Sequence, residues 1–164
     1  MYLKQIVPHF SIFLLVLAST AGAQDIDRKQ GEWGHLAKYI GTYNYDAVLS
    51  DDEVSEKLTS ILGDDLERLK RNLSVHGPIG FNGSCLILTG NAPHSGFVEN
   101  AYLNICLSRE TVDIVLTDED AIQIYSEKSL FGHLDWMLRS WIFRFQSEKH
   151  FTSMPVDISL IQTD

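Results

Sequence analysis

The histidines and cysteines are the residues of this chain whose types and spacing bear most directly on chemistry. After a hydrophobic N-terminal segment the histidines are His35, His76, His94, His133 and His150. Their spacing matches no metal-binding motif, and two cysteines, Cys85 and Cys106, are too few for a structural zinc site. We therefore predict no metal and no cofactor.

Sequence motifs typical of enzymes are also missing. The chain contains no Gly-x-Ser-x-Gly, no His-Glu-x-x-His and no phosphate-binding glycine loop. We predict no catalytic residue and a protein that is not an enzyme. A hydrolase built from scattered carboxylates is the alternative, because such a site has no local motif.

His94 has the most distinctive surroundings of the five histidines. It belongs to the stretch Gly90-Asn91-Ala92-Pro93-His94-Ser95-Gly96, which separates the apolar runs 85–88 and 102–107. Such a pattern predicts two strands joined by a loop, and a loop longer than a tight hairpin needs is often functional. Pro93 fixes one backbone angle and restricts the residue before it, so we expect a stiff loop that presents His94. The alternative is a solvated connector.

The N-terminal segment has the features of a secretory signal peptide. Lys4 is followed by an apolar run over 10–18, which is short for a bilayer span, and by the small residues of 21–23. We predict a signal peptide over residues 1–23 and a single domain over 24–164 that ends in a helical extension. The alternative is an uncleaved membrane anchor.

The chain is acidic. The full chain has a net charge of −9, and because Lys4 is the only charged residue in 1–23, the remainder carries −10. This charge argues against nucleic acid and against anionic membrane surfaces as partners, and it suits a basic protein partner. A homodimer is also compatible with the sequence.

The exported part divides into helices followed by a meander. Helical spacing predicts helices over 32–40, after a capping box at Ser50-Asp51-Asp52-Glu53, and after a cap at Asp64. From Ser74 onward the hydrophobic period becomes two, and a last helix is predicted over 130–145. The predicted cross-strand pairs are Ile79–Leu86, Cys85–Cys106, Leu88–Leu103, Ile105–Ile114 and Leu116–Ile122.

These pairs separate the strand residues into two faces. One face is entirely apolar and includes Val75, Leu103, Ile122 and Ile124, whereas the other is mixed and includes His76 and Tyr125. We therefore predict an α+β fold, in which a five-stranded antiparallel meander has helices packed on its apolar face, plus a C-terminal helix. The opposition of Cys85 and Cys106 also predicts a disulfide.

The segment from Gly41 to Tyr125 resembles the Ivy family, the periplasmic inhibitors of vertebrate (C-type) lysozyme. In that family a loop of pattern Cys-x-Pro-His-x-Cys projects from an antiparallel sheet, enters the lysozyme cleft and brings its histidine to the catalytic carboxylates. Here Asn91-Ala92-Pro93-His94-Ser95-Gly96 keeps the proline and the histidine, and Asn91 and Gly96 replace the two cysteines.

The resemblance implies a periplasmic inhibitor of C-type lysozyme, or of a related basic peptidoglycan-cleaving enzyme, with His94 as the inhibitory residue. It also suggests that a Cys85–Cys106 disulfide stabilises the base of the loop in place of the missing one. The alternative is an Ivy-like module that has lost inhibition and binds another envelope protein.

Overall fold

The computed structural model describes residues 31–96, 98–119, 121–128, 130–150 and 157–163. The predicted signal peptide over 1–23 lies outside these residues. No helix in the described part of the chain is long and apolar enough to cross a membrane.

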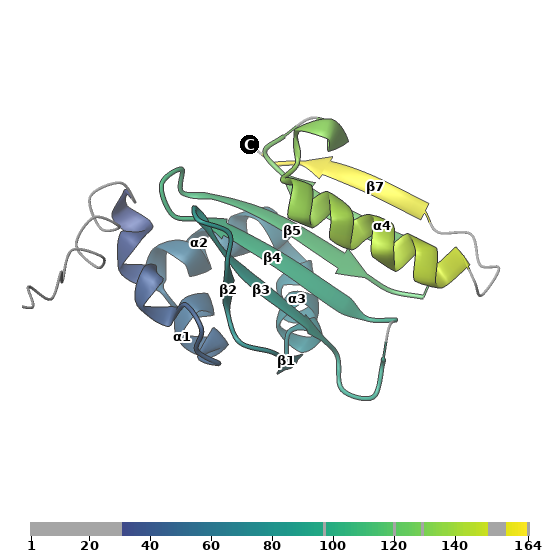
Figure 1. Ribbon diagram of the computed structural model, residues 1–164, viewed down its shortest axis with the longest axis horizontal. Helices are drawn as coiled ribbons and strands as arrows, with labels where there is room; N and C mark the ends of the chain where they lie inside the picture. Colours follow the sequence, from purple (N-terminus) through teal and green to yellow (C-terminus); the bar gives the residue numbers. More distant parts are fainter. Residues whose placement is uncertain (1–30, 97, 120, 129, 151–156, 164) are drawn as a thin grey trace, which may run out of the picture.

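A seven-stranded sheet forms the centre of the fold, with helices on both of its faces (Figure 1). The strands follow the order β1-β3-β4-β5-β6-β7, and β2 also pairs with β3. All neighbours are antiparallel except β6 and β7, which are parallel. The strands are β1 Val75–His76, β2 Gly80–Phe81, β3 Cys85–Asn91, β4 Asn100–Cys106, β5 Thr111–Thr117, β6 Ala121–Ser126 and β7 Asp157–Gln162. The α+β class is confirmed.

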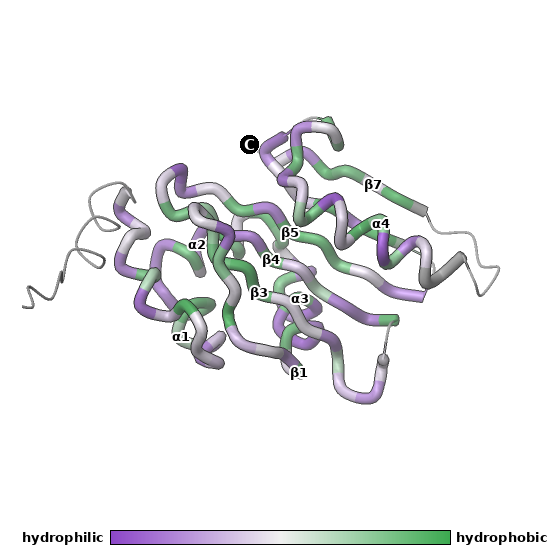
Figure 2. Tube along the Cα trace, in the orientation of Figure 1, coloured by the Kyte–Doolittle hydropathy of each residue, from purple (hydrophilic) through white to green (hydrophobic). Residues whose placement is uncertain are grey.

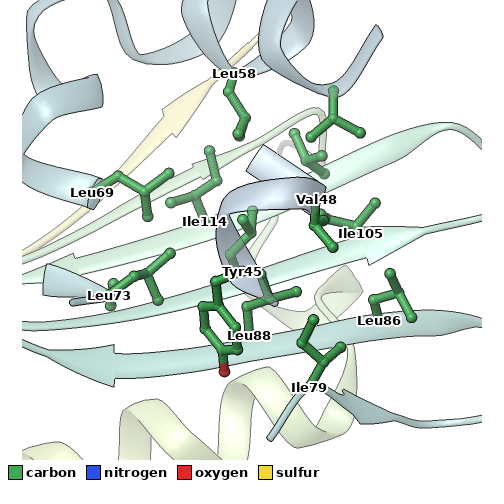
Figure 3. Packing of buried hydrophobic residues seen from close by; sticks show 14 of the residues in the cluster. Tyr45, Val48, Leu58, Leu69, Leu73, Ile79, Leu86, Leu88, Ile105 and Ile114 are labelled. Carbon is green, nitrogen blue, oxygen red and sulfur yellow. The ribbon is translucent and has the colours of Figure 1, made fainter. Parts of the chain in front are cut away.

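The first face of the sheet is covered by the N-terminal helices. These are η2 Glu32–Tyr39, α1 Tyr45–Leu49, α2 Asp52–Leu62, η3 Gly63–Asp65 and α3 Leu66–Asn72. In α2 the buried residues Val54, Leu58 and Leu62 recur every four positions, which gives the helix one apolar stripe. Leu58 of α2 and Leu69 of α3 pack against strand residues such as Ile114 (Figure 3). Gly63 ends α2 with φ 50°, a conformation that glycine adopts at little cost.

The predicted caps of the second and third helices are wrong. Asp51, not Ser50, is the N-cap residue of α2, and it makes no capping hydrogen bond. Instead Asp51 Oδ2 lies 2.6 Å from His35 Nε2, while His35 Nδ1 donates to the Glu32 carbonyl at 2.9 Å. The hydrogen bond to Asp51 raises the pKa of His35, because both ring nitrogens face acceptors.

The start of α3 also differs from the predicted one. Asp65, not Asp64, precedes the helix, and it too makes no capping hydrogen bond. One Asp65 oxygen pairs with Arg68 at 3.2 Å, and the other accepts a hydrogen bond from the Tyr125 hydroxyl. Both carboxylates therefore make tertiary contacts that a capping motif does not reveal.

The second face is covered by α4 Trp136–His150, which connects β6 to β7. Leu138, Ile142 and Phe145 of α4 pack on Val115 and on other residues of the sheet. The helix begins six residues later than predicted, because residues 131–133 form the 3-10 helix η4 and Asp135 Oδ1 accepts the Met137 N–H at 2.8 Å. The strand β7 was not predicted at all.

Two hairpins are shifted by two residues from the predicted register. Phe81 pairs with Leu86, and Ile105 pairs with Val112, so each turn contains four residues in place of two. At the first turn, Asn82 Oδ1 accepts the backbone N–H groups of Ser84 and Cys85, which stabilises the wider turn. A shift of two keeps every side chain on its predicted face.

Two other segments are shifted by one residue and change face. Ile122 pairs with Thr117, so Ile122 and Ile124 join the second-face cluster and Tyr125 joins the first. Val75 pairs with Asn91, which leaves Val75 48% exposed. Because α4 makes the second face an apolar core as well, the isoleucines of β6 can face either cluster, and the pattern of hydrophobic residues does not determine which one they face.

The break between β1 and β2 is filled by a side chain from α1. Tyr45 Oη donates to the Thr89 carbonyl at 3.2 Å and accepts the Thr89 N–H at 3.1 Å, so this residue of β3 has a partner on the edge where neither β1 nor β2 pairs with it. The Tyr45 ring also stacks on His76 with 3.8 Å between ring centroids. His76 therefore has a packing role at the edge of the sheet.

Gly90 allows the last turn of α3 to approach β3 closely. A Cβ atom at this position would lie 2.9 Å from both Leu73 Cα and Val75 O. We expect Gly90→Ala to lower the free energy of unfolding by about 1–3 kcal/mol, because two backbone segments would have to move. Urea denaturation measures this change. Gly77→Ala is the matched control, since nothing lies within 4 Å of its Cβ; equal effects of the two variants would contradict this account of the packing.

Candidate partner-binding loop

The segment 92–99, called the His94 loop below, connects β3 to β4. The last pair of these strands is Asn91 with Asn100, and the loop projects beyond it, away from the helices (Figure 1). Pro93, His94 and Gly96 are exposed, whereas Ala92 is buried. Figure 2 shows that this projection is hydrophilic in comparison with the strands. The structure thus presents the histidine at the surface.

Three backbone hydrogen bonds shape the loop. Ala92 N–H donates to the Glu99 carbonyl at 2.9 Å, Ser95 N–H donates to Ala92 at 3.2 Å, and Val98 N–H donates to Ser95 at 2.9 Å. The second bond closes a four-residue turn with Pro93 in its second position and His94, at φ 62°, in its third. This arrangement matches a type II turn. A positive φ is uncommon for a residue with a side chain, and it directs His94 by backbone geometry.

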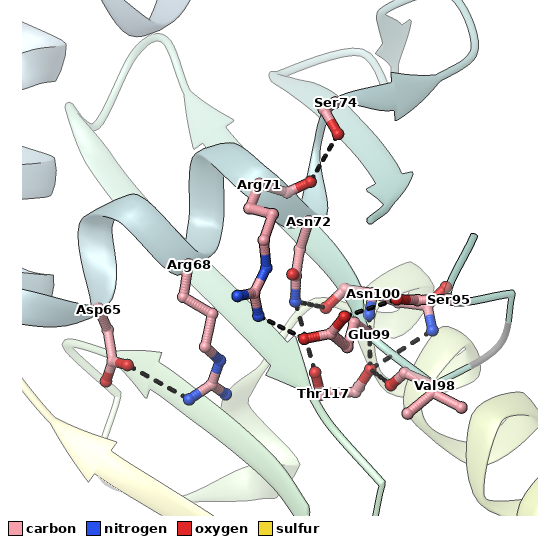
Figure 4. Close-up of polar contacts among 10 residues, drawn as sticks. All are labelled: Asp65, Arg68, Arg71, Asn72, Ser74, Ser95, Val98, Glu99, Asn100 and Thr117. Carbon is pink, nitrogen blue, oxygen red and sulfur yellow. Dashed lines mark hydrogen bonds and ion pairs between the residues drawn. The ribbon is translucent and has the colours of Figure 1, made fainter. Parts of the chain in front are cut away.

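The Glu99 side chain joins the loop to α3. One carboxylate oxygen of Glu99 pairs with Arg71 of α3, and the other accepts a hydrogen bond from Ser95 Oγ at 2.5 Å (Figure 4). Ser95 directly follows His94, so this contact fixes the turn that carries the histidine. Charge-assisted hydrogen bonds of this kind are stronger than those between neutral groups.

A second set of contacts fixes the other end of the loop. Thr117 Oγ1 donates to the Val98 carbonyl at 2.8 Å and accepts the Asn100 N–H at 2.9 Å. The buried Asn72 Nδ2 donates to the Asn100 carbonyl at 3.1 Å (Figure 4). The end of β5 and the last residue of α3 therefore hold the point where the loop returns to the sheet.

The predicted loop residues have different surroundings in the structure. Asn91 belongs to β3, and its Nδ2 donates to the Ala92 carbonyl at 2.9 Å. Gly96 adopts φ 55° and nothing lies within 4 Å of a Cβ built on it. The two residues that replace the family's cysteines thus contribute one hydrogen bond and one left-handed turn position.

A disulfide joins Cys85 to Cys106, as predicted from the register. The expectation that it stabilises the base of the loop is wrong. Cys85 and Cys106 pair at one end of β3 and β4, whereas Asn91 and Asn100, which flank the loop, pair at the other. The disulfide therefore stabilises the end of the sheet that is remote from His94.

The residues that hold the loop were not predicted from the sequence. Arg71, Asn72 and Thr117 lie on α3 and β5, far from His94 in the chain, and no local motif includes them. Glu99 is close in sequence, but nothing in its neighbourhood points to Arg71. Among the described residues, no group of three or more His, Cys, Asp or Glu side chains is arranged to hold a metal ion.

Comparison with known proteins gives one result that bears on this geometry. The family described as inhibitor of vertebrate lysozyme (Ivy) matches residues 53–141, which are more than half of the chain and include the whole His94 loop. No curated protein and no solved structure matches the chain. On the strength of the family match, the chain belongs to the Ivy family of inhibitors of vertebrate lysozyme.

Proposed function

We propose that this protein inhibits C-type lysozyme, or a related peptidoglycan-cleaving enzyme, by inserting the tip of the His94 loop into the active-site cleft. The observation that carries the proposal is the position of His94. It lies exposed, next to Pro93, in a turn that is tied to the body of the protein by Glu99. The family match supports a lysozyme as the partner.

The chemistry of the target suits an imidazole. Lysozymes cleave glycosidic bonds with a pair of carboxyl groups, one of which acts as the acid, on either side of the scissile bond. An imidazole has two ring nitrogens on opposite sides, so one His94 ring can hydrogen-bond to both carboxyl groups. A loop in that position also occupies the space of the sugar, which gives inhibition without any reaction.

Tight binding also depends on a loop that is already ordered before it meets the partner. Ordering flexible side chains and loops costs affinity, so a preformed loop binds more tightly. In the family pattern two cysteines flank the proline and the histidine, and here they are absent. We propose that the Arg71–Glu99–Ser95 contacts replace that covalent constraint.

The charge of the protein favours such a complex. The chain carries a net charge of −9, and C-type lysozymes are commonly basic. Opposite charges accelerate association and make it sensitive to salt. We also infer that the protein is exported, with a signal peptide over 1–23 and a single periplasmic domain over 24–164. This domain would act as a monomer or a homodimer.

His94→Ala should weaken binding to a C-type lysozyme without changing the fold. A hydrogen bond to a charged carboxylate is worth about 1.5–3 kcal/mol, so we expect the dissociation constant to rise roughly ten- to a hundredfold. Isothermal titration calorimetry measures the constant, and circular dichroism checks the fold.

His133→Ala is the matched control, since His133 is also exposed but lies in η4. If His94→Ala binds as tightly as wild type, His94 is not the inhibitory residue. If wild type binds lysozyme without slowing cell-wall lysis, the chain is a binding module that does not inhibit. If wild type does not bind, the proposed partner is wrong.

Glu99→Ala should loosen the loop while leaving the sheet intact. The variant removes the acceptor for both Arg71 and Ser95, so we expect the Ser95 and Val98 amides to exchange with solvent roughly tenfold faster or more. Hydrogen exchange followed by NMR measures these rates. Glu67→Ala is the control, because its ion pair with Lys70 lies within α3 and is exposed. Unchanged exchange at Ser95 in Glu99→Ala would show that other contacts order the loop.

A further inference from the structure

A pocket of about 300 Å³ opens at the base of the His94 loop, and it is called the base pocket below. Its lining includes Asn91 and Asn100, the pair that flanks the loop, together with Val75 and Gly77 at the edge of the sheet and Trp141 of α4. A loop that enters a cleft brings the rim of the cleft to its own base. The base pocket is therefore placed to receive a side chain from that rim.

The hydrogen bonds of the two asparagines determine which atoms they can offer. Asn91 Nδ2 donates to the Ala92 carbonyl, and Asn100 Nδ2 donates to Thr117 Oγ1 at 3.4 Å. The first acceptor is a carbonyl oxygen, so the nitrogen must face it. Thr117 Oγ1 already donates to Val98, so it can only accept from Asn100. Each of these bonds uses one N–H of its amide, so the orientation of both side chains is set and both Oδ1 atoms are available to accept a hydrogen bond from a ligand.

The remaining lining adds an aromatic surface and one histidine, His76, whose ring stacks on Tyr45 and whose Nδ1 lies 3.0 Å from the Gly77 carbonyl. Trp141 is half-buried, and its ring packs against Tyr102 with 5.7 Å between centroids. The lining contains no lysine and no arginine. Acceptor oxygens beside an indole ring suit a planar cation with several donors, because a guanidinium can donate to the oxygens and lie against the ring.

We propose that the base pocket binds an arginine side chain of the partner enzyme, as a second contact beside the His94 loop. This inference rests on the proposed function for the identity of the partner, but the chemistry of the pocket is independent of it. An arginine on the rim of the cleft would then fix the orientation in which the loop enters. The net charge of −9 favours a partner that carries such residues.

Gly77 allows a direct test of the charge preference. It is exposed, its φ is not in the left-handed region, and nothing lies within 4 Å of a Cβ at this position, so an added side chain meets no neighbouring atom there. Gly132 has the same properties but lies in η4, and it does not line the base pocket. Charge changes at Gly77 and Gly132 alter the net charge of the protein equally.

The first experiment measures the dissociation constant for a C-type lysozyme by calorimetry. A cation in the base pocket predicts that Gly77→Lys weakens binding roughly tenfold and that Gly77→Asp strengthens it about threefold, whereas Gly132→Lys and Gly132→Asp change it less than about twofold. One outcome would overturn this inference alone: lysozyme binds wild type, His94→Ala weakens that binding, but Gly77→Lys and Gly132→Lys have the same dissociation constant. The base pocket is then not a cation site, and the proposed function stands.

The second experiment does not require lysozyme. N-acetyl-arginine methylamide is titrated into the protein, and NMR follows the side-chain amides of Asn91 and Asn100 and the indole of Trp141. We expect these signals to shift with saturation, and N-acetyl-citrulline methylamide, which has the same shape without the charge, to shift them at least tenfold less at equal concentration. Equal shifts with the two compounds, or none, would overturn the proposal even if lysozyme does not bind.

Discussion

The antiparallel pairing of β3 with β4 is the constraint on which the rest of the structure depends. It runs without interruption from Cys85–Cys106 to Asn91–Asn100. Because side chains alternate along a strand, this one register directs Leu86, Leu88, Leu103 and Ile105 to the first core. It also places the disulfide at one end of the pair and the His94 loop at the other.

The opposite ends of this pair are stabilised in different ways. A covalent bond closes the end at Cys85, whereas the loop end depends on polar contacts from α3 and β5. Gly90 makes the second arrangement possible, since it lets α3 come close enough for Arg71 and Asn72 to reach Glu99 and Asn100. The helices on the first face therefore serve the loop as well as the core.

The sequence predicted the parts of the fold that depend on local pattern. The α+β class, the β3–β4 register and the exposed Pro93-His94 tip followed from alternation and from the loop between two apolar runs. The faces of Ile122 and Tyr125 did not, because α4 makes the second face an apolar core as well, so the isoleucines of β6 can face either core. The contacts of Arg71 and Thr117 with the loop are tertiary, so no spacing in the chain encodes them.

The candidate site was predicted in the same uneven way. His94 could be proposed as a candidate because proline and glycine mark the turn around it, and the family match covers the same residues. The base pocket could not, since Val75, Asn100 and Trp141 come from three separate elements. Its acceptor character emerges only when the hydrogen bonds of both asparagines are known.

Competition at the lysozyme cleft tests the central claim most directly. The protein is titrated into a C-type lysozyme in the absence and in the presence of a chitin oligosaccharide that saturates the active-site cleft. If the His94 loop enters the cleft, the apparent affinity must fall in proportion to the concentration of the oligosaccharide, as expected for two ligands of one site. An affinity that does not change with the oligosaccharide would contradict the account, because the protein would then bind outside the cleft.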